Sequence, residues 1–255
     1  PRGCIRMSDL QHHLNIQRGD VGRYVLLPGD PGRCEPIAAL FDNPRHVATN
    51  REYVTYTGTL EGVPVSVVST GIGCPSTAIA VEELIKTGAD TFIRVGTSGS
   101  IQTDTPSGHL AIVTAAIRDE GTTSHYLPIE FPAIAHPQIV DALSSAAKTM
   151  GAETLSGVSQ SKDSFYGEVE PDRMPMASRL KDRWLAWRRG GAICSEMEAS
   201  ALFILSSMYG ARAGGVMHMM GVGPDLDPGR EKLLATAVES LRVLIRQDKE
   251  DVQWP

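Results

Sequence analysis

The chain has 255 residues, of which 42% are hydrophobic and 21% are charged. This is ordinary globular composition, and it argues against collagen, coiled coil and intrinsic disorder. The 24 basic and 30 acidic residues give a net charge of −6, which has the wrong sign for a protein that binds a phosphate backbone. We therefore expect one globular domain over residues 1–255 and no nucleic-acid partner.

Cysteine spacing and hydropathy give a first indication of the compartment. The cysteines at positions 4, 34, 74 and 194 form no C-x-x-C motif, so we expect reduced thiols and neither a disulfide framework nor a zinc site. No apolar run approaches the roughly 20 residues that cross a bilayer, and the first residues lack the apolar segment of a signal peptide. These features predict a soluble, cytoplasmic protein with no membrane partner.

Short β-branched or apolar runs predict the strands. They cover residues 24–27, 53–60, 63–69, 91–95, 110–117, 155–158 and 213–220. Glu61-Gly62 joins two alternating runs, which predicts a tight antiparallel hairpin. Because the strands alternate with helical patterns, we expect an α/β fold with one mixed, twisted β-sheet flanked by helices.

Apolar residues at helical spacing predict the helices. The first three end at Gly88, Gly151 and Gly210, and the fourth carries its apolar stripe from Leu234 to Ile245. The third stripe begins at Met197. Residues 160–191 do not fit this pattern, because glycines, prolines, tryptophans and basic residues are mixed there. We predict a functional loop followed by a short exposed helix.

Two segments that follow predicted strands could bind an anion. The turn PGDPGR at 28–33 offers backbone N–H groups and the Arg33 guanidinium, although an ordinary strand-to-helix turn also explains it. Arg94 lies in an apolar strand that runs into Gly96-Thr97-Ser98-Gly99-Ser100. A buried cation needs an anion beside it, so this segment predicts a phosphate or carboxylate cradle. The alternative is a solvent-facing Arg94 next to a plain turn.

Two further segments have ambiguous patterns. Gly71-Ile72-Gly73 allows a ligand or a second strand to approach the backbone closely. Ser195 and Glu198 match a helix capping box, yet Glu198 also falls at the edge of an apolar stripe, where its carboxylate could accept from two ribose hydroxyls. Periodicity leaves both interpretations open. The sequence has no G-x-S-x-G or H-E-x-x-H motif, so serine hydrolase and metalloprotease chemistry have no support.

Six segments together resemble the nucleoside phosphorylase family, specifically its uridine phosphorylase branch. They are LLPGDPGR, TNREYVTYTG, VVSTGIGCPSTAIAVEEL, FIRVGTSGSIQ, SKDSFYG and SEMEASAL, and the likeness covers about residues 10–215. It implies reversible phosphorolysis of uridine, deoxyuridine or thymidine to free base and pentose 1-phosphate in pyrimidine salvage. It also implies a hexamer built from dimers. Inorganic phosphate is then a co-substrate, and no other cofactor is needed apart from a monovalent cation such as K⁺.

The resemblance also assigns roles to residues that match the motifs. Arg94, Thr97 and Glu198 would be catalytic. The phosphate site would consist of Gly29, Arg33, Arg94 and Thr97, together with Arg51 of the neighbouring subunit. The nucleoside site would consist of His13 from that neighbour, Phe165 stacked on the base, Glu168, and Met197 and Glu198 at the ribose. A monovalent cation would lie at Glu52, Ile72 and Ser76.

Two departures from the family pattern affect recognition of the base. Glu168 follows Phe165-Tyr166-Gly167, where relatives that cleave uridine carry a glutamine and often an arginine. A carboxylate accepts from an N–H but cannot donate to a carbonyl, and Arg173 of the same loop is a candidate donor. Residues 221–225 lack the expected Asn-Arg pair. Three alternatives therefore remain: a phosphorylase for 6-oxopurine nucleosides, a nucleoside-binding or storage protein, and, less favoured because water needs no arginine cluster, a nucleosidase.

Overall fold

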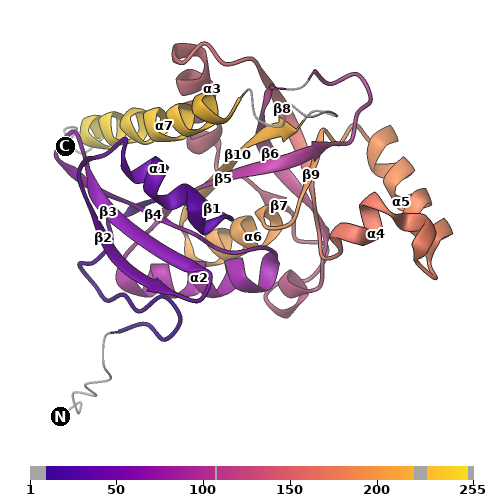
Figure 1. Ribbon diagram of the computed structural model, residues 1–255, viewed down its shortest axis with the longest axis horizontal. Coiled ribbons are helices and arrows are strands. Elements are labelled where there is room, and N and C mark those ends of the chain that lie inside the picture. Colours follow the sequence, from indigo (N-terminus) through magenta and orange to yellow (C-terminus); the bar gives the residue numbers. More distant parts are fainter. Residues whose placement is uncertain (1–9, 107, 221–228, 252–255) are drawn as a thin grey trace.

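The computed structural model describes residues 10–106, 108–220 and 229–251 (Figure 1). The described strands are β1 (Tyr24–Pro28), β2 (Asp42–Asn50), β3 (Tyr53–Leu60), β4 (Val63–Val68), β5 (Thr91–Ser100), β6 (Leu110–Asp119), β7 (Ala133–Ile134), β8 (Thr154–Lys162), β9 (Cys194–Glu196) and β10 (Arg212–Met220). The described α-helices are α1 (Cys34–Ala38), α2 (Cys74–Thr87), α3 (Pro137–Thr149), α4 (Phe165–Val169), α5 (Ala177–Arg189), α6 (Ala199–Tyr209) and α7 (Arg230–Asp251).

All these strands belong to one mixed sheet. Its order is β10-β6-β8-β9-β5-β1-β4-β3-β2, with β7 beside β6. Because β10 also pairs with β5, the strands β5, β10, β6, β8 and β9 form a closed ring of pairings. Neighbours of β1 run parallel to it, whereas β2, β3 and β4 form an antiparallel meander. The predicted α/β fold with a mixed sheet is confirmed.

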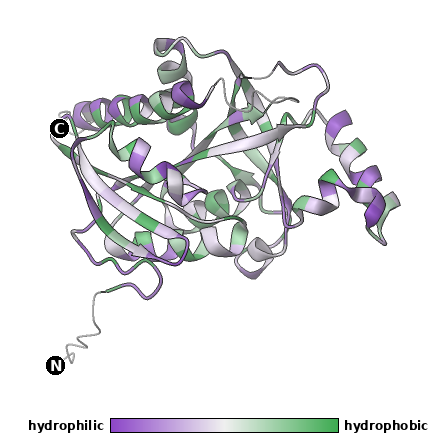
Figure 2. Cartoon of the chain, viewed as in Figure 1, coloured by the Kyte–Doolittle hydropathy of each residue, from purple (hydrophilic) through white to green (hydrophobic). Residues whose placement is uncertain are grey.

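Helices cover both faces of the sheet (Figure 1). One apolar cluster joins α2 and α6 to one face, and a second joins α1, α3 and α7 to the other. β1 is buried along its whole length, as expected of a central strand whose residues face one cluster or the other. α4 and α5 lie at the edge of the molecule, and α5 is mainly hydrophilic (Figure 2). Neither α4 nor α5 contributes a residue to either apolar cluster.

Most predicted elements are confirmed, and the differences cluster around one region. The segment Gly96–Ser100 is part of β5, not a turn, because it pairs with the end of β10. β8 continues to Lys162, so the predicted loop of residues 160–191 begins with a strand, while its exposed helix is confirmed as α5. The third helix begins at Ala199 and not at Met197, because Ser195 and Glu196 belong to β9. The Glu61-Gly62 hairpin is confirmed, with positive φ at both residues.

The helices and the cysteines bear on two further expectations, the absence of a membrane-spanning segment and the presence of reduced thiols. Within the described residues, the helices are either too short or too polar to span a bilayer. Cys34, Cys74 and Cys194 are free and buried, as expected of reduced thiols. Cys4 and residues 221–225 lie outside the described residues.

Candidate active site

A cavity of about 1370 Å³ collects residues from distant parts of the chain. Its walls come from the turn after β1, the turn before α2, the end of β5, the end of β8, helix α4 and the junction of β9 with α6. These are mostly places where a strand ends, which is where α/β sheets bind ligands. The predicted site residues that line it are Gly29, Arg33, Glu52, Ile72, Arg94, Thr97, Phe165, Glu168, Met197 and Glu198.

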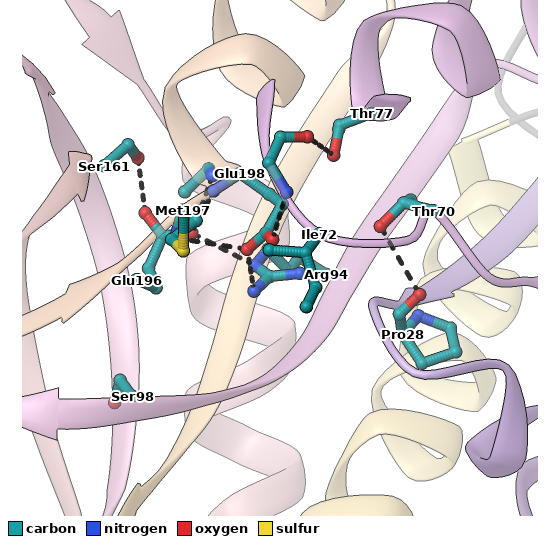
Figure 3. Close-up of polar contacts among 12 residues, drawn as sticks. Pro28, Thr70, Ile72, Thr77, Arg94, Ser98, Ser161, Glu196, Met197 and Glu198 are labelled. Carbon is teal, nitrogen blue, oxygen red and sulfur yellow. Dashed lines mark hydrogen bonds and ion pairs between the residues drawn. The ribbon is translucent and has the colours of Figure 1, made fainter. Parts of the chain in front are cut away.

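Arg94 is a buried cation of this cavity, with 5% of its surface exposed. Its Nε lies 3.1 Å from Glu196 Oε2, and its Nη2 forms an ion pair with Glu198 (Figure 3). Within the described residues, Nη1 is buried without a hydrogen-bond partner. The solvent-facing alternative for Arg94 is therefore wrong. A buried guanidinium N–H without a partner is costly. Nη1 lies close to the turn after β1, because it is 3.8 Å from the position that a Cβ would take on Gly29.

Glu196 is a further site residue, which the sequence motifs did not single out. Its carboxylate accepts from Arg94 and Ser161, and from the backbone N–H groups of Glu198 (2.7 Å) and Ala199 (2.8 Å). It therefore occupies the start of α6, where N–H groups lack helical partners. The capping-box interpretation of Ser195 and Glu198 is wrong, because Glu196 takes that role. The position of Glu196, two residues before Glu198, could have indicated its role, because an extended chain places alternate residues on the same side.

Glu198 is held at the cavity wall by backbone donors. Its carboxylate accepts from the N–H of Gly73 at 2.7 Å and from that of Met197 at 3.2 Å. Gly71 and Gly73 have φ of +69° and +99°, so the Gly71-Ile72-Gly73 turn needs glycine to aim this N–H. Burial raises the pKa of Glu198, and the nearby Glu196 charge raises it further, against the opposing effect of Arg94. Hydrogen bonds fix the carboxylate in place, and its surroundings make it bind a proton more readily than an ordinary glutamate does.

Three other predicted phosphate residues, Gly29, Arg33 and Thr97, line the same cavity. A Cβ on Gly29 would come within 3.2 Å of the Gly71 carbonyl oxygen, which is a tighter contact than most Cβ atoms make, so glycine suits this close approach of two backbone segments. The Asp30 carboxylate accepts from the Gly32 N–H at 2.8 Å, which turns the chain so that Arg33 reaches the cavity. Thr97 is half-buried in β5. Gly29, Arg33 and Thr97 thus line the cavity together with Arg94, and the two arginines give it positive charge.

Two of the residues predicted to bind phosphate or nucleoside do not line the cavity of their own chain. Arg51 is exposed in the turn between β2 and β3, with φ of +54°. His13 is held beside α2, because the Glu83 carboxylate lies 2.7 Å from its Nδ1 and accepts from its backbone N–H at 3.0 Å. The Asn50 side chain donates to the His13 carbonyl at 2.7 Å. His13 and Arg51 are thus placed outside the cavity that holds Arg94.

The predicted cation residues gather around Gly71. A Cβ built there would lie 2.7 Å from Glu52 Cγ and 3.4 Å from Ser76 Oγ, so these two side chains are close neighbours. Ser76 Oγ donates to the Ile72 carbonyl at 3.2 Å. The group combines a carboxylate, a carbonyl and a hydroxyl, the oxygen donors that hard cations prefer.

Another part of the cavity wall is aromatic and charged. Phe165 is 51% exposed there, and the Glu168 carboxylate lies 3.1 Å from Lys162 Nζ. The predicted donor of this loop, Arg173, is exposed, forms an ion pair with Glu170 and does not line the cavity, so that expectation is wrong. Lys162 lines it instead. Lys162 belongs to the segment SKDSFYG, for which the family resemblance implied no role of the lysine, although this residue ends a strand.

Comparison with known proteins identifies the family. Residues 23–242 match the model of the phosphorylase superfamily. The chain is 47% identical over 252 residues to a uridine phosphorylase of Treponema pallidum, covering 96% of this chain and 98% of the relative. It is 44% identical to a uridine phosphorylase of Thermococcus kodakarensis (94% and 89% covered) and 38% identical to a guanosine phosphorylase of Halorubrum lacusprofundi (83% and 83%). The chain therefore belongs to the phosphorylase superfamily, and its resemblance to uridine phosphorylases is confirmed.

Proposed function

We propose that residues 1–255 form one catalytic domain, a cytoplasmic pentosyltransferase that cleaves uridine reversibly with phosphate in pyrimidine salvage. Deoxyuridine and thymidine are further candidate substrates. One observation carries this proposal: Arg94 Nη1 is buried without a partner among the described residues, at the end of the cavity shared with Gly29, Arg33 and Thr97. An inorganic oxyanion supplies the missing acceptor. The relatives named uridine phosphorylase support the choice of nucleoside.

The proposed mechanism depends on where the charges lie. Phosphate held by Arg94, Arg33 and Thr97 attacks C1′ of the nucleoside while the bond from C1′ to the base breaks. C1′ acquires positive character as the base leaves, and the phosphate beneath it is both nucleophile and counter-charge. Glu198 accepts from the ribose hydroxyls with Met197 beside it, which fixes the sugar above the phosphate. Holding both reactants in line can remove roughly 7–11 kcal/mol from the barrier.

We further propose that a neighbouring subunit completes each site. Arg51 and His13 project outside their own cavity, and Arg51 is exposed in this chain. In a hexamer built from dimers, Arg51 would reach the phosphate and His13 the ribose 5′-hydroxyl of the adjacent copy. Glu52, Ile72 and Ser76 would hold a monovalent cation such as K⁺, whose charge would offset that of Glu52 near this interface.

A change at Glu83 tests the role of the His13 segment. Glu83→Gln removes the charge of the carboxylate that contacts the backbone N–H and Nδ1 of His13 and accepts a hydrogen bond from the Leu14 N–H. We expect the KM for uridine to rise about 10-fold, the cost of a hydrogen bond to a charged group. The KM for 5′-deoxyuridine should stay close to that of the wild type, because this substrate lacks the 5′-hydroxyl. Equal changes in the two KM values would contradict the role of His13; Glu82→Gln on the same helix is the control.

A second candidate function is phosphorolysis of 6-oxopurine nucleosides. Glu168 favours it, because a carboxylate accepts well from the ring N–H of such a base. The guanosine phosphorylase among the relatives also supports it. The two candidate functions are separated by measuring how fast free base is released in the presence of phosphate. The substrates to compare are uridine, thymidine, inosine, guanosine, cytidine and adenosine. Uracil released fastest supports the first function, and hypoxanthine or guanine released fastest supports the second. Binding of these nucleosides without any cleavage would support a storage protein.

A further inference from the structure

Lys162 is a buried cation in the wall of the same cavity, near Phe165 and Glu168. It is the last residue of β8, where it pairs with Asp119 of β6, and only 6% of its surface is exposed. Its Nζ lies 5.9 Å from the centre of the exposed Phe165 ring. Lys162, Phe165 and Glu168 all line the cavity that contains Arg94. A cation, a carboxylate and an open aromatic ring thus meet in one place.

Neighbouring side chains fix the position of this ammonium group. Nζ donates to Ser195 Oγ at 2.6 Å and lies 3.1 Å from Glu168 Oε2. Ser195 Oγ lies within hydrogen-bonding distance of both Glu168 Oε2 (2.6 Å) and Gln160 Oε1 (2.8 Å), although its single proton serves only one of them at a time. Gln160 is oriented by its own donation to Asp119 at 2.7 Å. Two of the three N–H groups of Lys162 have partners among the described residues, which leaves one for a ligand.

Stability does not explain a lysine at this position. Removing an ammonium and a carboxylate from water costs several kcal/mol per ion, and apolar residues of similar size often serve folding as well or better. Lys162 and Glu168 instead place a hydrogen-bond donor next to an acceptor at the cavity wall. Uracil and 6-oxopurines present the complementary edge, a ring N–H adjacent to a carbonyl, whereas cytosine and adenine present an amino group beside a bare ring nitrogen.

We propose that Lys162 binds the oxo group of the nucleobase and stabilises the negative charge that the base gains as it leaves, while Glu168 accepts from the adjacent ring N–H. This inference rests on the proposed phosphorolysis. A phosphate oxygen forms a bond to C1′ as the bond between C1′ and the base nitrogen breaks. The electron pair of that bond moves into the base and spreads onto its oxo oxygens, next to the ammonium. The released base anion then takes a proton from water.

Lys162→Met tests this role, because methionine keeps an unbranched stem and loses the charge. Single-turnover rates should be measured at saturating phosphate with uridine and with 5-fluorouridine, whose fluorine already stabilises the base anion. We expect the variant to lose about 100-fold with uridine, the size of a lost transition-state donor. With 5-fluorouridine the loss should be about 10-fold, because less of the charge depends on the enzyme. Lys162→Arg, which keeps the cation, should retain most of the activity with both substrates.

Equal losses with the two nucleosides, or no loss with either, would overturn the proposal. Lys162→Gln is the second neutral variant, which gives the same comparison if the methionine variant does not fold. Lys148→Met, at an exposed position of α3, is the matched control and should behave as the wild type. If the wild type and this control release no base with phosphate, the proposed function fails. If both are active and Lys162→Met keeps full activity, only the role of Lys162 fails.

Discussion

Replacing Arg94 with lysine should lower phosphate-dependent cleavage of uridine by about 1,000-fold, the upper range for a lost oxyanion donor. Lysine keeps a positive charge between Glu196 and Glu198, but it has no second N–H arm to reach the anion. Arg94 uses Nε and Nη2 on these carboxylates and leaves Nη1 for a ligand. A compact ammonium group cannot reproduce the planar fork with which the Arg94 guanidinium spans the two carboxylates and still directs Nη1 away from them.

Steady-state kinetics with varied phosphate measures this effect, and a thermal melt separates it from unfolding. Arg94→Ala is a poorer test, because it leaves two buried carboxylates without a cation, which costs about 3–5 kcal/mol of stability. Arg23→Lys, at a half-exposed position, is the control and should keep wild-type kinetics. A lysine variant with a normal KM for phosphate and normal turnover would contradict the assignment of Arg94.

Glu198→Gln should reduce kcat/KM for uridine by about 100-fold, because an amide replaces the charged acceptor of two ribose hydroxyls. The loss should be smaller for 2′-deoxyuridine, which offers only one of these hydroxyls. Thermal melts again report on folding. Equal losses for the two nucleosides would contradict the ribose role, and a lower melting temperature with unchanged kinetics would indicate that Glu198 serves only the structure.

The pH dependence follows from the raised pKa of Glu198. Burial and the neighbouring Glu196 charge raise it above the ordinary value of 4.5. The ionised carboxylate accepts from both hydroxyls, so nucleoside affinity should fall as pH drops through the raised pKa. Wild-type kcat/KM should therefore decline on the acid side at a higher pH than an ordinary glutamate would give. Glu198→Gln should lose this decline, which a pH series at saturating phosphate would detect.

Local chemistry made most of the fold predictable. β1 is an apolar run buried on both faces, and α2 ends at Gly88, whose φ of +105° is left-handed. β2 was missed because its residues are mostly exposed and polar and include Pro44, as suits an edge strand. The three-residue β9 was missed because its pairing with β5 and β8 is a tertiary property.

The site was predictable in part. The family motifs pointed to residues that line one cavity, including Arg94, Thr97, Phe165 and Glu198. Glu196 and Lys162 were missed because their environments depend on long-range pairing. Glu196 meets Arg94 102 positions away, and Lys162 meets Ser195 33 positions away. Sequence patterns report on neighbours along one helix or strand, so they cannot identify such contacts.

The products formed from uridine test the central claim most directly. The enzyme is incubated with uridine and inorganic phosphate, and the products are measured by phosphorus NMR and by chromatography of the base. We expect ribose 1-phosphate and uracil in equal amounts. Omitting phosphate should stop uracil release. Free ribose as the sugar product, or uracil released equally fast without phosphate, would contradict an anion site at Arg94 that supplies the nucleophile.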